Sequence, residues 1–320
     1  MQMRMLGSSI LIKVSVIAIL AACSIQAGIP LDPDNLDQAW LAALALAHEA
    51  GMNHGRDIVF TYGPLGYTHP YQAYLPSTFS SYITGHLLVT AIQCIVIACA
   101  AASAHVGVFL SAVFAVAVAQ SLVKTDLLFY LALYSSAVLL IRGLDASLTR
   151  WSLLTLILIG LNLAIASLYK FTGLAISMLI FPLCLASLGR LIPPRGLKVA
   201  IATYIFSFIS IWSGLGGKIA TIPGYISNSM EISSNYDAAM ALAGRTRDTV
   251  LGVAALLVYA VILALSAYRS RWAVSRTIPL ATLLFGITFI VWKAAYVRQD
   301  DGHLLLFPMF IGWAGCFAHL

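Results

Sequence analysis

Residues 249–268 read TVLGVAALLVYAVILALSAY, twenty residues in a row without a charged side chain. A helix of about 20 apolar residues spans the roughly 30 Å hydrocarbon core of a bilayer. The sequence therefore predicts an all-α integral membrane protein with about ten transmembrane helices. The nine other runs that reach or approach this length are 6–27, 82–104, 106–123, 127–141, 152–168, 172–189, 199–215, 277–296 and 304–320.

The composition of the whole chain agrees with lipid as its main solvent. Of the 320 residues, 61% are hydrophobic and 9% charged, and the mean hydropathy is +0.93. Soluble domains carry about 25% charged residues. The five cysteines show no CxxC spacing, so we expect small buried side chains rather than metal ligands or disulfides. The sequence has no Walker motif and no GxGxxG, which argues against an ATP-driven or dinucleotide mechanism.

Charge distribution predicts the orientation in the membrane. With the N-terminus cytoplasmic, the three short loops 142–150, 190–198 and 269–276 are basic and lie inside, as the positive-inside rule requires. Eleven of the twelve acidic residues then lie outside, and Asp145 alone lies inside. The net charge of +6 is thus read as a topology signal, with no nucleic acid as a partner. We expect a multi-pass protein of a bacterial inner membrane.

Two outer loops are long enough to fold. They divide the chain into a signal-anchor or first transmembrane helix, a first outer loop, transmembrane helices 2–7, a second outer loop and transmembrane helices 8–10. The corresponding ranges are 1–27, 28–81, 82–215, 216–248 and 249–320.

Each outer loop contains an amphipathic stretch that could lie along the membrane interface. In the first loop Leu36, Trp40, Leu44 and Ala47 recur at helical spacing, and Gly51 is placed to end the helix.

The N-terminal segment allows two interpretations. Leu20-Ala21-Ala22-Cys23 matches the lipobox of bacterial lipoprotein signals, in which Cys23 is lipidated after cleavage. Such a pattern also arises in helices rich in alanine and leucine, and we expect a retained signal-anchor helix.

The potentially chemical side chains gather on the predicted outer side. Charges in or beside transmembrane segments are costly, so their clustering on one side indicates a function. A carboxylate can accept a proton from an attacking hydroxyl, while Lys or Arg neutralises the charge on a departing phosphate. Carboxylates beside cations at a membrane surface therefore favour a reaction on a phosphate-linked substrate.

Several stretches resemble the first loop and later turns of a widespread, mostly uncharacterised group of bacterial multi-span proteins. These are DQAW at 37–40, GRDIVFTYGPLG at 55–66, KFTG at 170–173, and Arg298 with DGH at 301–303. The group is loosely similar to the GT-C class of glycosyltransferases. The resemblance implies transfer of a sugar from a polyprenyl-phosphate carrier at the outer face, with membrane lipid and the lipid-linked sugar as partners. The class sometimes binds a divalent metal ion, and whether this chain does is left open.

Roles follow from that resemblance residue by residue. Asp37 is the expected catalytic base and Asp57 a second carboxylate or metal ligand, while Asp301 and His303 belong to the acceptor side. The expected phosphate-binding residues are Lys170, Arg298, Lys124 and Arg56. If these groups form one site, Asp37 or Asp57 must lie within about 10 Å of Lys170 or Arg298, near the Debye length at 0.1 M salt.

Plainer interpretations stay open for each group. A first-turn Asp can serve a helix cap, adjacent Arg56 and Asp57 can pair at the surface, and the cations can anchor lipid headgroups. For the whole chain the alternatives are a transporter or flippase of a lipid-linked or small polar substrate, and a non-catalytic membrane scaffold. The sequence ends at Leu320, at the edge of an apolar run, whereas GT-C proteins often continue, so a fragment is a further alternative.

Overall fold

The computed structural model describes residues 36–70, 75–101, 126–143, 150–188, 194–269, 274–315 and 317. These residues are 83% helical and contain no strand, which confirms the all-α prediction for this part of the chain. The α-helices are α2 (Leu36–Glu49), α3 (Phe79–Ala101), α5 (Leu127–Gly143), α6 (Arg150–Tyr169), α7 (Phe171–Ser187), α8 (Arg195–Gly214), α9 (Ile222–Met240), α10 (Thr246–Arg269), α11 (Val274–Val297) and α12 (Asp301–Gly315).

Eight of the ten expected spans correspond to a helix. The other two, 6–27 and 106–123, lie outside the described residues. Among the described helices, five are long and apolar enough to cross a membrane: α3, α6, α8, α10 and α11. The apolar helices α5, α7 and α12 are shorter, with 17, 17 and 15 residues.

Helix α5 occupies the centre of the bundle. It contacts α3, α6, α7, α11 and α12, and every one of its side chains from Leu127 to Val138 is buried. A helix that is apolar all round is stable only where protein or lipid surrounds it on every side. Protein surrounds α5, so its 17 residues need not match the thickness of a bilayer.

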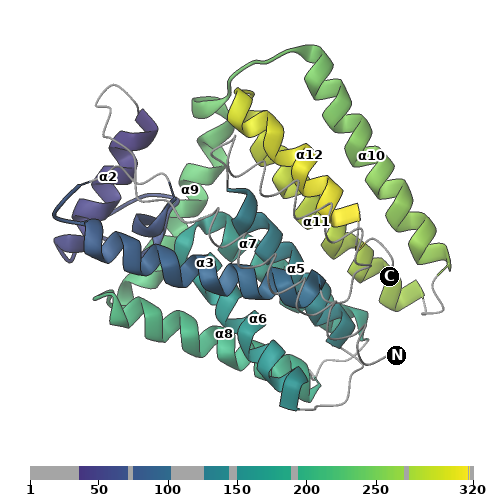
Figure 1. Cartoon of the computed structure of the whole chain (residues 1–320), viewed down its shortest axis with the longest axis horizontal. Helices are drawn as coiled ribbons and strands as arrows, with labels where there is room; N and C mark the ends of the chain where they lie inside the picture. The colour runs from purple at the N-terminus through teal and green to yellow at the C-terminus, as the bar shows by residue number, and fades with distance from the viewer. Residues whose placement is uncertain are drawn as a thin grey trace, which may run out of the picture.

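In Figure 1, helices α6 and α8 lie on one side of α5, and helices α10, α11 and α12 lie on the other. Helices α6 and α8 pack closely together, while α10 packs against α11 and α12. Only 22% of the apolar window of α10 is buried inside the protein, compared with 61% for α6. Helix α10 therefore presents most of its apolar surface outward, as a lipid-facing helix does.

The segment predicted as the first outer loop, 28–81, contains the expected helix. Helix α2 ends at Glu49, and Gly51 follows with φ +64°, the left-handed conformation that closes many helices. Its buried face is rotated relative to the predicted stripe, because Leu36 is 66% exposed while Leu41 and Ala45 are buried. The second outer loop likewise forms a helix, α9, after the short 3₁₀ helix Ile219–Thr221.

Candidate functional site

Charged side chains gather where α2 meets the turn between α11 and α12. Arg298 Nη1 lies 3.1 Å from the Asp37 carboxylate, and Arg298 Nε lies 2.9 Å from Asp300 Oδ2. Asp300 also lies 2.7 Å from His303 Nδ1. The Trp40 indole donates a hydrogen bond of 3.2 Å to Asp37. We call these five residues the surface cluster, because the side chains of its four ionisable residues are 24–41% exposed.

The contact between Asp37 and Arg298 confirms the predicted convergence of a first-loop carboxylate with a distant cation. The two residues are 261 positions apart in the sequence. Backbone hydrogen bonds hold the turn that carries Arg298 in place, from Leu242 N to Val297 O at 3.1 Å and from Gln299 N to Leu242 O at 3.2 Å. The segment after α9 therefore fixes the turn against which α2 rests.

Neighbouring charges shift the pKa values of Arg298 and Asp300 in favour of their ionised forms. Partial burial by itself would lower the pKa of Arg298, but the carboxylates of Asp37 and Asp300 outweigh it, and the net shift is upward. For Asp300 burial would raise the pKa, and hydrogen bonds from His303 together with the charge of Arg298 bring it below its ordinary value. Arg298 therefore offers a permanent positive charge at a partly exposed position.

A second group of charges lies deeper in the same region. Lys170 Nζ donates a hydrogen bond of 2.7 Å to Asp126 Oδ2, and His69 Nε2 lies 3.3 Å from Asp126 Oδ1. The Lys170 ammonium also lies 5.0 Å from the centre of the Tyr62 ring, within the range of a cation–π interaction. We call Tyr62, His69, Asp126 and Lys170 the buried cluster. The side chains of its three charge-bearing residues are only 9–21% exposed.

The TYGPL stretch docks the first loop onto the joint between α6 and α7. Backbone hydrogen bonds run from Gly63 N to Tyr169 O at 3.1 Å and from Phe171 N to Thr61 O at 2.7 Å. A Cβ on Gly63 would lie 2.3 Å from the Leu168 carbonyl oxygen, so only glycine fits this close approach. The glycine of the motif thus has an architectural role, and it brings Tyr62 to Lys170.

Opposite charges balance the cost of burial in the buried cluster. Burial alone would raise the pKa of Asp126, but Lys170 and His69 outweigh it and hold the pKa well below its ordinary range. Burial would lower the pKa of Lys170, and Asp126 reverses the direction. Both groups are therefore charged, and each depends on the other.

Trp40 connects the two clusters. Its ring centre lies 4.7 Å from that of Tyr62 and 5.3 Å from that of Phe60. Its indole nitrogen bonds to Asp37 on the other side. Trp40 and Phe60 are partly exposed, whereas Tyr62 is buried. The result is a partly exposed aromatic surface of Trp40 and Phe60, with the two rings tilted by 46°, that begins next to the carboxylate of Asp37.

Arg56 and Asp57 pair with each other. The Arg56 guanidinium makes two contacts with the Asp57 carboxylate, at 2.8 and 2.9 Å, and Asp57 also accepts a hydrogen bond from Asn53 N at 3.0 Å. These hydrogen bonds hold the pKa of Asp57 well below its ordinary value. The structure thus matches the surface-pair interpretation of both residues, and their functional roles stay predictions.

The other predicted residues are placed only in part. His303 belongs to the surface cluster and Lys170 to the buried one. Lys124 lies outside the described residues, as does the side chain of Asp301, although its backbone begins α12. In the described ranges no three His, Cys, Asp or Glu side chains are grouped to hold a metal ion.

Sequence reasoning did not assign site roles to Trp40, Asp126 or Asp300, all of which belong to the two clusters. A signal existed for Asp126, because a carboxylate directly before an apolar segment is costly and needs a partner. Which cation pairs with it depends on the packing of α5 against the α6–α7 joint, and periodicity carries no information on that.

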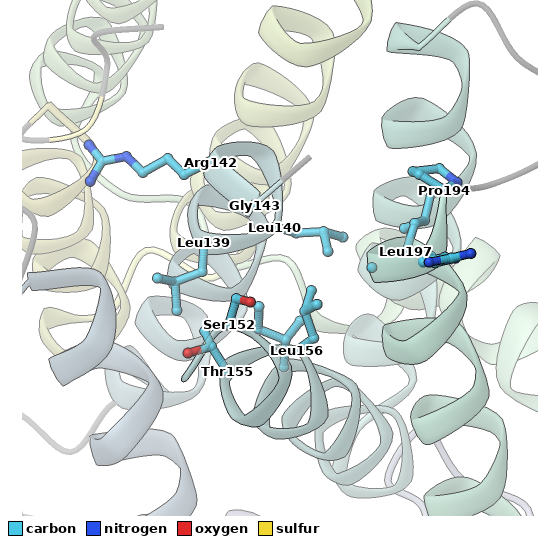
Figure 2. A pocket seen from close by; sticks show the side chains of 12 residues that line it. Leu139, Leu140, Arg142, Gly143, Ser152, Thr155, Leu156, Pro194 and Leu197 are labelled. Carbon is cyan, nitrogen blue, oxygen red and sulfur yellow. The ribbon is translucent and has the colours of Figure 1, made fainter. Parts of the chain in front are cut away.

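A cavity of about 480 Å³ is lined by the last turn of α5 and the first turns of α6 and α8. Figure 2 shows its apolar side chains, together with Ser152 and Thr155. Arg142 extends away from them, and its guanidinium carbon lies 5.6 Å from the centre of the Phe317 ring. Gly143 and Pro194, which line the cavity, are next in sequence to segments 144–149 and 189–193, and these lie outside the described residues, so we assign no site to it.

Comparison with known proteins gives no relative: no family model, no curated protein and no solved structure matches this chain.

Proposed function

We propose that this chain is a multi-pass inner-membrane protein of the GT-C kind, which transfers a sugar from a polyprenyl-phosphate donor at the periplasmic face. In this proposal the N-terminus is cytoplasmic, and the chain crosses the membrane with the ten expected spans. The observation that supports it best is the contact of 3.1 Å between Asp37 and Arg298.

In this proposal Asp37 is the base and Arg298 the cation that binds the donor phosphate, and their contact of 3.1 Å supports a shared site. The donor phosphate competes with Asp37 for Arg298, and the released carboxylate faces the acceptor. The acceptor hydroxyl then forms a bond to the anomeric carbon and gives its proton to Asp37. The bond from that carbon to the phosphate oxygen breaks, and the leaving phosphate keeps the electron pair beside Arg298.

The aromatic surface of Trp40 and Phe60 suits the sugar of such a donor. Aromatic rings bring a large apolar face together with, in Trp40, one polar nitrogen. That nitrogen already orients the carboxylate of Asp37. In this proposal Arg298 holds the phosphate, because Lys170 is engaged by Asp126 at 2.7 Å.

Sugar transfer by membranes that carry the protein tests the proposal. Asp37→Asn removes the base with almost no change in size, and we expect a loss of about 10²- to 10⁴-fold in rate. Asp57→Asn is the matched control, because Asp57 is engaged by Arg56, and it should retain most of the rate. Equal rates for wild type and Asp37→Asn would exclude Asp37 as the base. The glycosyltransferase proposal would be refuted if the wild-type chain transferred no sugar and a chain extended beyond Leu320 transferred none either.

Orientation is testable in a cysteine-free background. Single cysteines in place of Pro70 or Asn235 should react with an impermeant reagent added outside, while those in place of Ser147 or Pro193 should not. Labelling of the Ser147→Cys protein from outside would invert the topology and remove the periplasmic site.

A transporter or flippase is the second candidate, and one feature of α3 favours it. His86, Thr90 and Gln93 share one face of this apolar helix, and each is at most 5% exposed. Buried polar residues within a span are typical of transport pathways. Gln93→Leu should impair a transporter and leave a transferase active, whereas Asp37→Asn should do the reverse.

A further inference from the structure

A small pocket lies between the polar face of α3 and the buried cluster. Its volume is about 30 Å³, and its walls include Thr90, Gln93, Asp126, Phe129 and Tyr169. These residues come from α3, from the start of α5 and from the end of α6. The pocket is separate from the surface cluster that carries the proposed chemistry.

The α3 wall of the pocket is polar at a depth where polarity is costly. Gln93 is 14 residues after Phe79, the first residue of the helix, which corresponds to about 21 Å along the axis. Burying an amide or hydroxyl without a hydrogen-bond partner costs roughly 1–3 kcal/mol in proteins. Thr90 and Gln93 therefore need a polar partner inside the protein.

Asp126 presents an unsatisfied acceptor to the same pocket. Its Oδ2 binds Lys170, but its Oδ1 is buried without a hydrogen bond from any described residue. His69 Nε2 lies 3.3 Å from Oδ1, a long contact that leaves room for a further donor to this oxygen. Buried carboxylate oxygens in native proteins are normally satisfied by protein or by ordered water.

We propose that the pocket binds one or two ordered water molecules, which donate to Asp126 Oδ1 and bridge it to Gln93 and Thr90. A water needs about 10–15 Å³ of such space and two to four polar partners, and the pocket supplies both. A cation is disfavoured because the ammonium of Lys170 and the imidazole of His69 already face the carboxylate. The water links α3 to α5 and completes the hydrogen bonding of the buried ion pair.

Radiolytic hydroxyl labelling tests this site on the whole protein in detergent, because radicals formed from bound water modify adjacent side chains even when these are buried. Phe129 and Tyr169, each 3% exposed, line the pocket. Phe310 and Tyr259, at 0% and 1%, are the matched controls away from it. We expect Phe129 and Tyr169 to be labelled at least several-fold faster than their controls.

Two variants identify the source of the label. Gln93→Leu keeps a similar side-chain volume and removes both polar atoms, and Thr90→Val is close to isosteric. Either variant should slow the labelling of Phe129. The labelling of Tyr268, which is exposed, should not change. Labelling of wild-type Phe129 and Tyr169 as slow as that of Phe310 and Tyr259 would overturn the proposal. So would unchanged labelling of Phe129 in folded variants. If the variants do not fold, the wild-type comparison still decides.

Discussion

The buried and surface clusters contain the same kinds of groups at neighbouring positions, yet their environments differ. In the buried cluster the ion pair of Lys170 and Asp126 is 21% and 14% exposed. In the surface cluster the pair of Arg298 and Asp37 is 24% and 41% exposed. Water screens the second pair more than the first, mainly because Asp37 is far more exposed than Asp126, so the same substitution has different consequences in each.

The difference in exposure suggests a structural role for the buried cluster and a binding role for the surface cluster. Removing one partner of a buried pair leaves an uncompensated charge, so such a pair constrains the fold. A partly exposed carboxylate can exchange its partner for a substrate at little cost. The buried cluster is thus suited to hold the first loop on the bundle, and the surface cluster to bind.

The largest expected effect is on the buried pair. Asp126→Asn leaves the Lys170 ammonium unpaired and should lower the free energy of unfolding by about 3–5 kcal/mol. Denaturation of the purified protein in detergent measures this loss. The double variant Asp126→Leu/Lys170→Met should recover much of it, because no buried charge remains. A loss below about 1 kcal/mol would show that solvent reaches the pair, as it does exposed pairs.

The free energy of unfolding should depend on pH through His54, which lies in the loop between α2 and Tyr62. Burial lowers the pKa of His54 to about 4, more than its hydrogen bond with the Tyr62 backbone raises it. Between pH 6.5 and 4 the unfolded chain binds a proton on this residue that the folded chain does not. Stability should therefore fall by up to about 3 kcal/mol as the pH is lowered through this window.

Unfolding at pH 7.5 and pH 4.5 measures the effect, and His54→Gln should make the two values more similar. His48→Gln is the control, because His48 is only half-buried. An equal pH dependence in wild type and His54→Gln would assign the effect to another group.

A smaller effect is expected where the same loop meets α9. Gly55 has φ +82°, and a Cβ there would lie 2.3 Å from both Thr221 O and Tyr225 N. Gly51 has φ +64° with open space around it. Gly51→Ala should cost about 1–2 kcal/mol for the left-handed backbone alone, and Gly55→Ala should cost more. Similar unfolding midpoints for the two variants would mean that the loop can separate from α9.

The smallest effect should come from the surface cluster. Asp37→Asn breaks a partly exposed pair and should change the free energy of unfolding by less than about 1 kcal/mol. Denaturation under the conditions used for Asp126→Asn makes the comparison direct. A loss as large as that of Asp126→Asn would mean that Asp37 holds the fold together.

The sequence by itself determined the elements that rest on local patterns. Apolar runs predicted eight of the ten described α-helices to within a few residues, because the 20-residue requirement and helical periodicity act locally. Gly51 marked the end of α2 for the same reason. The sequence also predicted that Asp37 and Arg298 lie on the same side of the membrane, because the predicted topology puts both of their loops there.

The tertiary structure alone decided which charges meet. Asp37 pairs with Arg298 rather than Lys170, and Lys170 pairs with Asp126. These choices depend on how α5, the α6–α7 joint and the α11–α12 turn pack against the first loop. Packing also rotated the buried face of α2 and buried the polar face of α3. Such pairings join residues far apart in the chain, and no local pattern encodes which distant partner a charge meets.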